Sequence, residues 1–299
     1  MNVSRREFLC QVAIISASLI ASACACKKRA RRNIVSTTIQ EVIDTILKAM
    51  PDVPLEDTVD TFKSGDPSQQ VTGIVTTFLA SYEVIQRAIE LGANLIITHE
   101  PTFYGHRDEV DWLAGDSVYE AKRQLLEKNG IVVWRFHDYW HSHQPDGIVT
   151  GVIKELGWEK YVVPNTRSFP IFDIPPTSVR DLALYLKGKL GAQIVRVVGS
   201  LEMICRRVGL AVGASGGRWH IQFLGQEDVD VLITGEVSEW ETAEYVRDAG
   251  AQGKKLALIL VGHVNSEEPG MEYLVEWLRS RFPDFAISHV PTGDPFHSV

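Results

Sequence analysis

The chain has 299 residues, of which 45% are hydrophobic and 9% aromatic, and its formal net charge is −8. This length supplies enough apolar material for one large domain or two modest ones. The acidic balance argues against a general nucleic-acid binder, because such proteins carry a basic excess on one face, and it favours a small-molecule partner. Of the four cysteines only Cys205 lies beyond the first 26 residues, so we expect neither a disulfide framework nor a cysteine metal site.

The first 32 residues resemble a twin-arginine export signal. Arg5 and Arg6 precede the 15-residue apolar run VAIISASLIASACAC, which is shorter than the roughly 20 residues of a membrane span. Small residues before Cys24, or before Cys26, fit cleavage by a signal peptidase, and lipidation of Cys24 is an alternative. We expect a periplasmic protein, or one anchored to the membrane and facing the periplasm. An uncleaved N-terminus on a cytoplasmic protein is the competing interpretation.

Residues 33–146 predict an N-terminal α/β lobe. Apolar spacing, helix caps and turn glycines predict, in chain order, a helix at 37–50, a strand at 71–80, a helix at 82–91, a strand at 94–98, a helix that opens on a capping box at 117–120 and ends at Gly130, and a strand at 131–136. Strands that alternate with helices of this length form a parallel or mixed sheet covered by helices.

Residues 147–299 predict a second α/β lobe. Its expected elements are a helix at 178–190, strands at 193–197 and 208–212, the turn GASGG at 213–217, a strand at 229–234, a helix at 238–249, a strand at 256–261, a helix at 271–280 and a strand at 285–290. The tetrapeptides at 97–100 and 233–236 both end an apolar strand, and each is followed by a helix and a strand that leads to a histidine. This shared order predicts that the two lobes are related by duplication.

Several predicted strands end on imidazole or carboxylate side chains, and ligands of α/β sheets collect at that edge. These side chains are His99, Glu100, His137, His141, Glu236, His263 and Glu267. Imidazoles and carboxylates from separate strands suit zinc, manganese, iron or nickel. The alternative for any one of these histidines is a buried or loop histidine that bonds a backbone carbonyl.

Five segments of the body together resemble the NGG-one interacting factor three-like proteins, also labelled GTP cyclohydrolase I type 2 homologues. The segments are NLIITHEPTFYGH, WRFHDYWHS, RRVGLAVGASGG, DVLITGEVSEWETAEYVRDAG and LVGHVNSEEPGMEYLVEWL. The resemblance covers about residues 37–299. It implies two α/β lobes with a site for two divalent metal ions in the cleft between them, and a toroidal hexamer.

The same resemblance implies the ligand set His99, Glu100, His141, His263 and Glu267, with Glu267 bridging the metals. The family's first block usually reads His-His and its second reads His-Thr-Asn-Leu-Asp. In this chain Glu100 stands for the second histidine and His141 for the aspartate. The two exchanges look reciprocal, since they keep three imidazoles and two carboxylates in the set, but ligand type tunes a metal, so metal and substrate preference are left open.

Glu236 and His137 are expected to take part in chemistry rather than ligation. Glu236 is a candidate general base, or alternatively caps a helix, and His137 is expected to orient a ligand or bond substrate, or alternatively to be structural. The leading hypothesis is a hydrolase that uses two metals and acts on a phosphoester or nucleotide-like substrate. If the protein is exported, GTP itself is a less suitable substrate, because an exported protein meets little GTP. The competing class is a non-catalytic metal-binding scaffold or metal buffer.

Overall fold

The structure is a computed structural model that describes residues 37–51, 55–164 and 169–299. The predicted export signal at 1–32 lies outside the described residues. Among the residues described, no helix has both the length and the apolar character needed to cross a bilayer.

The first sheet has three parallel strands at its centre. Its spatial order is β1 (Phe62–Ser64), β4 (Val132–Arg135), β3 (Leu95–Thr98), β2 (Ile74–Thr77) and β10 (Ile287–His289). Only β1 runs antiparallel to its neighbour. Every residue of β2, β3 and β4 is buried, because helices cover both faces of the sheet.

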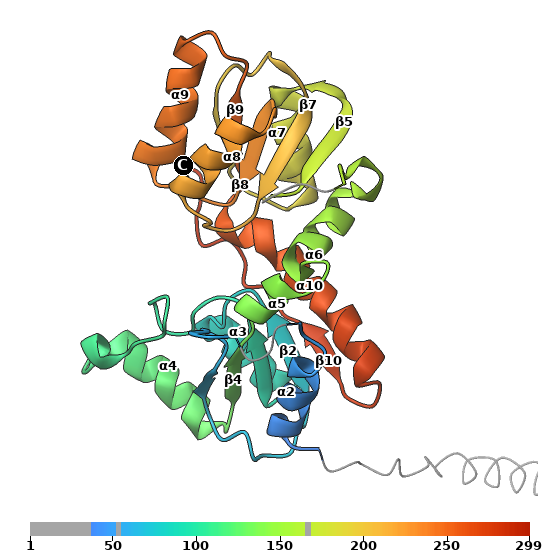
Figure 1. The fold of residues 1–299 in the computed structure, drawn as a ribbon. Coiled ribbons are helices and arrows are strands. Elements are labelled where there is room, and N and C mark those ends of the chain that lie inside the picture. The colour runs from blue at the N-terminus through green and yellow to red at the C-terminus, as the bar shows by residue number, and fades with distance from the viewer. Residues whose placement is uncertain (1–36, 52–54, 165–168) are drawn as a thin grey trace, which may run out of the picture. The chain divides into compact units, whose positions relative to one another are not determined.

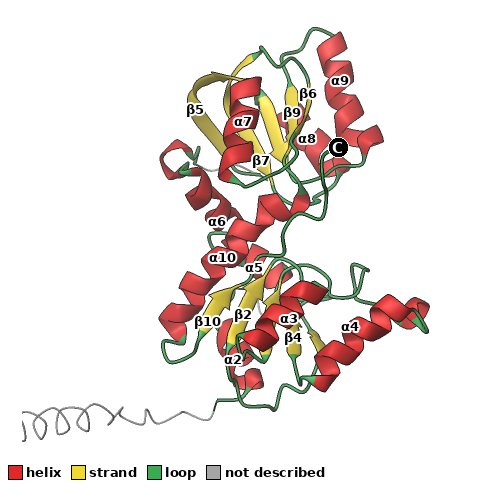
Figure 2. Cartoon of the chain, turned by 180° about the vertical axis from the view of Figure 1, so that it is seen from behind, coloured by secondary structure: helices red, strands yellow, loops and turns green. Residues whose placement is uncertain are grey.

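The helices on the two faces follow from the alternation of side chains along the strands. Ile97 and Trp134 point to the face covered by α2 (Ile39–Leu47) and α10 (His263–Arg281), whereas Ile96 and Val133 point to the face covered by α3 (Tyr82–Glu90) and α4 (Ser117–Lys128). Figure 1 shows α2 in front of this sheet, and Figure 2, from behind, shows α3 and α4 in front of it.

The starts of two helices show one predicted cap that forms and one that does not. Ser81 caps α3, as its position predicts, by accepting from the backbone N–H of Val84. The capping box expected at 117–120 does not form. Asp116 caps α4 instead, since its carboxylate accepts from two N–H groups of the first turn.

The second sheet repeats the parallel centre. Its order is β5 (Ile171–Ser178), β7 (Ile204–Ala211), β8 (Val231–Thr234), β9 (Ala257–Leu260) and β6 (Arg196–Val198), with β5 and β6 antiparallel at the edges. One face packs against α6 (Gly147–Leu156) and α7 (Val179–Lys189), and the other against α8 (Gly217–Gln226) and α9 (Glu244–Ala251). The remaining elements are α5 (Asp138–Ser142), two 3₁₀ turns (Asp111–Leu113 and Glu159–Tyr161) and a π-helix (Glu239–Ala243). The chain is thus an α/β protein with two lobes.

The C-terminal end of the chain joins the first sheet, whereas the sequence predicted a second lobe that spans 147–299. β10 pairs with β2 of the first sheet, and the second half of α10 packs into the core of that sheet through Met271, Leu274 and Leu278. At 19 residues α10 is about 28 Å long, enough to carry the chain from one sheet to the other. The boundary at 146 and the duplication stay predictions.

Candidate metal centre

Polar side chains gather at the carboxyl ends of two parallel strands of the first sheet and one strand of the second. β3 leads directly into His99 and Glu100, β4 leads into His137 and then α5 with His141, and β9 leads into His263 at the start of α10. Parallel strands place the residues that follow them at the same edge of a sheet, and α10 brings its first turn to that edge.

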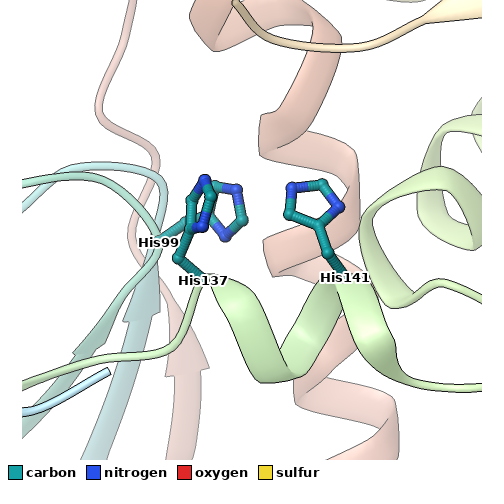
Figure 3. Close-up of side chains that lie close together, drawn as sticks. All are labelled: His99, His137 and His141. Atoms are coloured by element: carbon teal, nitrogen blue, oxygen red, sulfur yellow. The ribbon is translucent and has the colours of Figure 1, made fainter. Parts of the chain in front are cut away.

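Three imidazole rings form the first part of the site. The ring centroids of His99 and His137 are 4.6 Å apart, and each lies 5.0 Å from that of His141. Figure 3 shows the three rings drawn together from a strand end and from the short helix α5. Each ring is anchored by its Nδ1: His99 donates to the carbonyl of Phe136 at 3.2 Å, and His137 and His141 donate to the carboxylates of Asp138 and Asp146 at 2.9 Å. The anchors leave Nε2 of each ring as the free ligand atom.

His99 shows that these residues fit a metal ion. Its side chain is 0% exposed, and its Nε2 has no hydrogen-bond partner among the described residues. Burial, with the nearby charges of His137 and His141, holds the pKa of His99 well below its usual range, so the ring is neutral. A buried nitrogen lone pair without a partner is costly, and a cation would satisfy it. The ligand atoms of the three histidines lie within 4.8 Å of one another, as do those of His99, Glu100 and Glu267.

Carboxylates form the second part of the site. Glu267 is 3% exposed, and its Oε2 lies 3.1 Å from His263 Nε2 and 3.5 Å from His99 Nε2. His263 Nε2 is also 3.6 Å from Glu100 Oε1. Burial opposes protonation of His263, but hydrogen bonds to Glu100, Glu236 and Glu267 outweigh it and raise the pKa of His263 to about 12. His263 must therefore lose a proton before it can bind a metal.

The first turns of α10 and the GASGG turn position His263 and the Glu267 carboxylate. His263 and Glu267 stand four residues apart, so both project from the same face of the first turns of α10. Gly213 has φ 64°, and a Cβ there would lie 2.0 Å from Glu267 Oε1. The GASGG turn can therefore contact the Glu267 carboxylate only because its first residue is glycine. The N–H of Gly213 donates to Ser266 Oγ. That bond ties the turn predicted at 213–217 to α10.

Several residues that hold the site in place through hydrogen bonds were not among those predicted from the sequence. Asp60 accepts from the backbone N–H groups of His137 and the two residues after it, and so fixes the start of α5. Arg135 is fully buried and donates from Nε to the carbonyl of His99, while its Nη2 lies 3.4 Å from Glu100 Oε2. A lone arginine in an otherwise apolar strand was a usable signal for Arg135. Asp60, 77 residues before His137, offered none.

A family model covers most of the chain. The model described as Duf34/NIF3 (NGG1p interacting factor 3) matches residues 37–294. The chain belongs to this family. The resemblance inferred from the five sequence segments is thereby confirmed.

Individual relatives agree with the NIF3 assignment. The chain is 24% identical over 249 residues to a GTP cyclohydrolase 1 type 2 homolog of Clostridium perfringens, covering 79% of this chain and 89% of that protein. It is 26% identical over 239 residues to the homolog of the same name in Escherichia coli strain K12, covering 76% and 87%. A crystal structure of a Bacillus cereus protein related to NIF3 superposes with a TM-score of 0.72 at 16% identity, covering 88% of this chain and 99% of that one, and shows the shared fold.

In this NIF3-family chain the predicted site residues lie together. His99, Glu100, His263 and Glu267 contact one another through the atoms described above. His141 adjoins His99, and His137 adjoins both. Figure 3 shows that His137, expected to act from outside the ligand set, lies among the imidazoles. The roles assigned to these residues stay predictions.

Glu236 lies at the open side of the site. Its side chain is 57% exposed, and its Oε1 is 3.7 Å from His263 Nδ1. The hydrogen bond with His263 holds the pKa of Glu236 below its usual range. The carboxylate is therefore ionised and accessible.

A cavity of about 720 Å³ opens beside this carboxylate. Its polar wall contains Glu100, Glu236 and His263, and its apolar wall includes Phe78, Ile194, Leu260 and Phe296. The exposed side chain of His297 lines the same cavity. This size suits a small organic molecule.

Proposed function

We propose that this protein is a hydrolase that works with two divalent metal ions on a phosphoester or nucleotide-like substrate. The observation that carries the proposal is the place of Glu267, whose Oε2 lies between His99 Nε2 at 3.5 Å and His263 Nε2 at 3.1 Å. A carboxylate that faces two imidazoles from different strands is suited to bridging two ions. The Clostridium perfringens and Escherichia coli relatives are named after GTP, a nucleotide, and this supports the substrate class.

His99, Glu100, His141, His263 and Glu267 would hold the ions. Divalent ions bound there supply Lewis acidity that polarises an electrophilic phosphorus or ring carbon and acidifies water. His99 and His141 present Nε2 because their Nδ1 atoms are already bonded. Glu267 brings a negative charge that offsets part of the charge of the ions.

Glu236 would accept the proton of the attacking water. It is ionised, it is accessible, and it lies on the cavity wall next to His263. The apolar side chains of the opposite wall would hold the organic part of the substrate and exclude bulk water. Both effects strengthen electrostatic interactions inside the cavity.

Hydrolysis of phosphoesters and nucleotides by metal-stripped and metal-reloaded protein tests the proposal. We expect activity only after reloading, and Glu267→Gln should lower it by about 100-fold or more. Glu272→Gln is the matched control, since Glu272 is exposed on the same helix and does not belong to the ligand set, and it should keep full activity. Full activity of the stripped protein or of Glu267→Gln would refute the proposal.

A metal buffer or scaffold is the second candidate. It is favoured by the way the Glu100, Glu236 and Glu267 carboxylates already bond to protonated His263, which balances charge in the metal-free protein. Reversible uptake of metal with no turnover of any substrate would support it.

We also propose export of the protein and a ring of six copies. The leader pattern and the family resemblance, respectively, support these two proposals. Fusion of the leader to a reporter tests the first, because changing Arg5 and Arg6 to lysine should abolish export, and light scattering of the purified protein tests the second.

A further inference from the structure

We infer that the ligand cluster contains two chemically unequal metal positions, and that His137 is a ligand of the first. His99, His137 and His141 form what we call the imidazole position, and Glu100, His263 and Glu267 form the carboxylate position. The inference rests on the proposed function in one respect, since it takes the cluster to hold metal.

The three rings of the imidazole position have similar spacing and similar hydrogen bonds. The ring centroids of His99, His137 and His141 lie 4.6 to 5.0 Å apart, and each Nδ1 already donates to an oxygen. His137 bonds Asp138 at the same 2.9 Å at which His141 bonds Asp146. A carboxylate behind an imidazole is the usual support of a metal-binding histidine, because it fixes the ring and raises its basicity. His137 therefore has the support of a ligand as well as the position of one.

The carboxylate position offers mostly oxygen. Oε1 of Glu100 lies 3.6 Å from His263 Nε2, and Oε2 of Glu267 lies 3.1 Å from the same nitrogen. His263 is the imidazole that belongs to this position alone, since the ligand atom of His99 lies within 4.8 Å of those of Glu100 and Glu267 and of those of His137 and His141. Both carboxylates adjoin the imidazole position, because Glu267 Oε2 is 3.5 Å from His99 Nε2 and Glu100 Oε1 is 3.7 Å from His137 Nε2.

The inequality follows from where Glu100 and His141 stand. Glu100 follows β3 and faces His263, whereas His141 projects from α5 toward His99. Three imidazoles are therefore gathered on the α5 side, and both carboxylates lie between them and His263 of α10, since Glu100 Oε1 is also 3.7 Å from His137 Nε2. Nitrogen-rich sites favour zinc and nickel, and oxygen-rich sites favour manganese and magnesium. We expect the imidazole position to retain zinc and the carboxylate position to exchange its ion readily.

The first test uses the full-length wild-type chain. Stripped protein is given one equivalent of Zn²⁺, then excess Mn²⁺, and is freed of unbound metal by gel filtration. We expect about one zinc to remain, with an X-ray absorption spectrum dominated by imidazole nitrogen, and a second, exchangeable ion that gives the electron paramagnetic resonance signal of bound Mn²⁺. A zinc shell composed mainly of oxygen would overturn the inference.

The second test assigns the residues through metal affinity measured by competition with a chromophoric chelator. His137→Gln should weaken the first zinc by about 10-fold or more and leave Mn²⁺ binding unchanged, and Glu100→Gln, whose carboxylate adjoins both positions, should weaken Mn²⁺ binding more than zinc binding. His106→Gln is the matched control, because that ring lies 6.3 Å from His137 but is exposed and belongs to neither position. Unchanged zinc affinity in folded His137→Gln would overturn the ligand role of His137. The wild-type spectrum decides the same point if the variant does not fold.

The outcomes separate this inference from the proposed function. Two zinc ions bound with equal affinity, both weakened equally by either variant, would end the inference and leave a two-metal hydrolase possible. Two unequal positions without hydrolysis of any substrate would support the inference and remove the hydrolase. A chain that binds neither ion would end both.

Discussion

Glu267 Oε1 and the backbone of Gly213 lie so close that a single methyl group at residue 213 would reach to 2.0 Å from the oxygen. The GASGG turn of the second lobe thus forms one wall of the Glu267 carboxylate. Glu267 itself comes from α10, the helix that continues into the core of the first sheet. The site therefore depends on backbone as well as on ligand side chains.

Gly213→Ala should damage the site more than it damages the fold. Alanine at a φ of 64° costs about 1–2 kcal/mol of stability, and here the new Cβ must also displace Glu267. We expect metal affinity, measured by chelator competition, to fall by about 10-fold or more. Gly191→Ala is the matched control, since Gly191 has the same φ of 64° and open space around it. Equal metal affinity in the two variants would show that the contact with Glu267 is unimportant.

Metal binding should release protons from His263 and His141. Burial opposes protonation of His141, but the hydrogen bond to Asp146 outweighs it and raises the pKa of His141 to about 9, while that of His263 is about 12. Both rings are therefore protonated near pH 7, and each must lose a proton to bind metal. Calorimetry in buffers of different ionisation enthalpy should give about two protons per fully loaded chain near pH 7. The number should decline toward one near pH 10, because His141 is by then neutral, and a constant number would contradict this assignment.

His220 should make the metal-free protein less stable in mild acid. Its ring is 0% exposed between the hydroxyls of Ser215 at 2.9 Å and Thr242 at 3.0 Å, and burial lowers its pKa to about 4. As pH falls from about 6.5 to about 4, the unfolded chain binds a proton that the folded chain does not, so stability is lost in that window, by up to about 3 kcal/mol.

Urea unfolding near pH 7 and near pH 4.5 measures this loss. His220→Gln should reduce the difference between the two pH values, because glutamine does not titrate there. His297→Gln, which changes an exposed histidine near the C-terminus, should leave the wild-type difference intact. An unaltered difference in His220→Gln would exclude His220 as its source.

The sequence predicted the residues that follow the strands far better than the residues that hold them in place through hydrogen bonds. Neighbouring parallel strands share an edge, so His99, Glu100 and His137, which follow β3 and β4, could be expected near one another from pattern alone. His263 follows β9 of the second sheet, so only the family resemblance placed it with them. Asp146 and Asp60 could not be expected there, because their bonds to the site depend on how loops fold back on α5. Such contacts have no local periodicity.

Local patterns also predicted the elements of the fold better than their long-range partners. The pattern of 285–290 correctly predicts a strand but not its partner, and β10 joins the first sheet because α10 carries the chain there. The predicted helix at 271–280 is the second half of α10. Pro269 and Gly270 look like helix breakers, yet α10 continues through them, and Gly270 lies against Gly151 of α6 where a side chain would not fit.

Asp146→Asn should separate the support of a ligand from the capping of a helix. Asp146 does both, since Oδ2 accepts from His141 Nδ1 at 2.9 Å and Oδ1 accepts from Val149 N at 3.0 Å at the start of α6. Asparagine caps a helix about as well as aspartate, so stability should change little, but His141 loses its charged partner. We expect the pKa of His141 to fall and metal affinity to drop by about 10-fold. Asp116→Asn makes the same change at the cap of α4, which has no histidine partner among the described contacts, and should leave metal affinity unchanged. A drop of similar size in both variants would mean that helix capping, and not the carboxylate behind His141, sets the affinity.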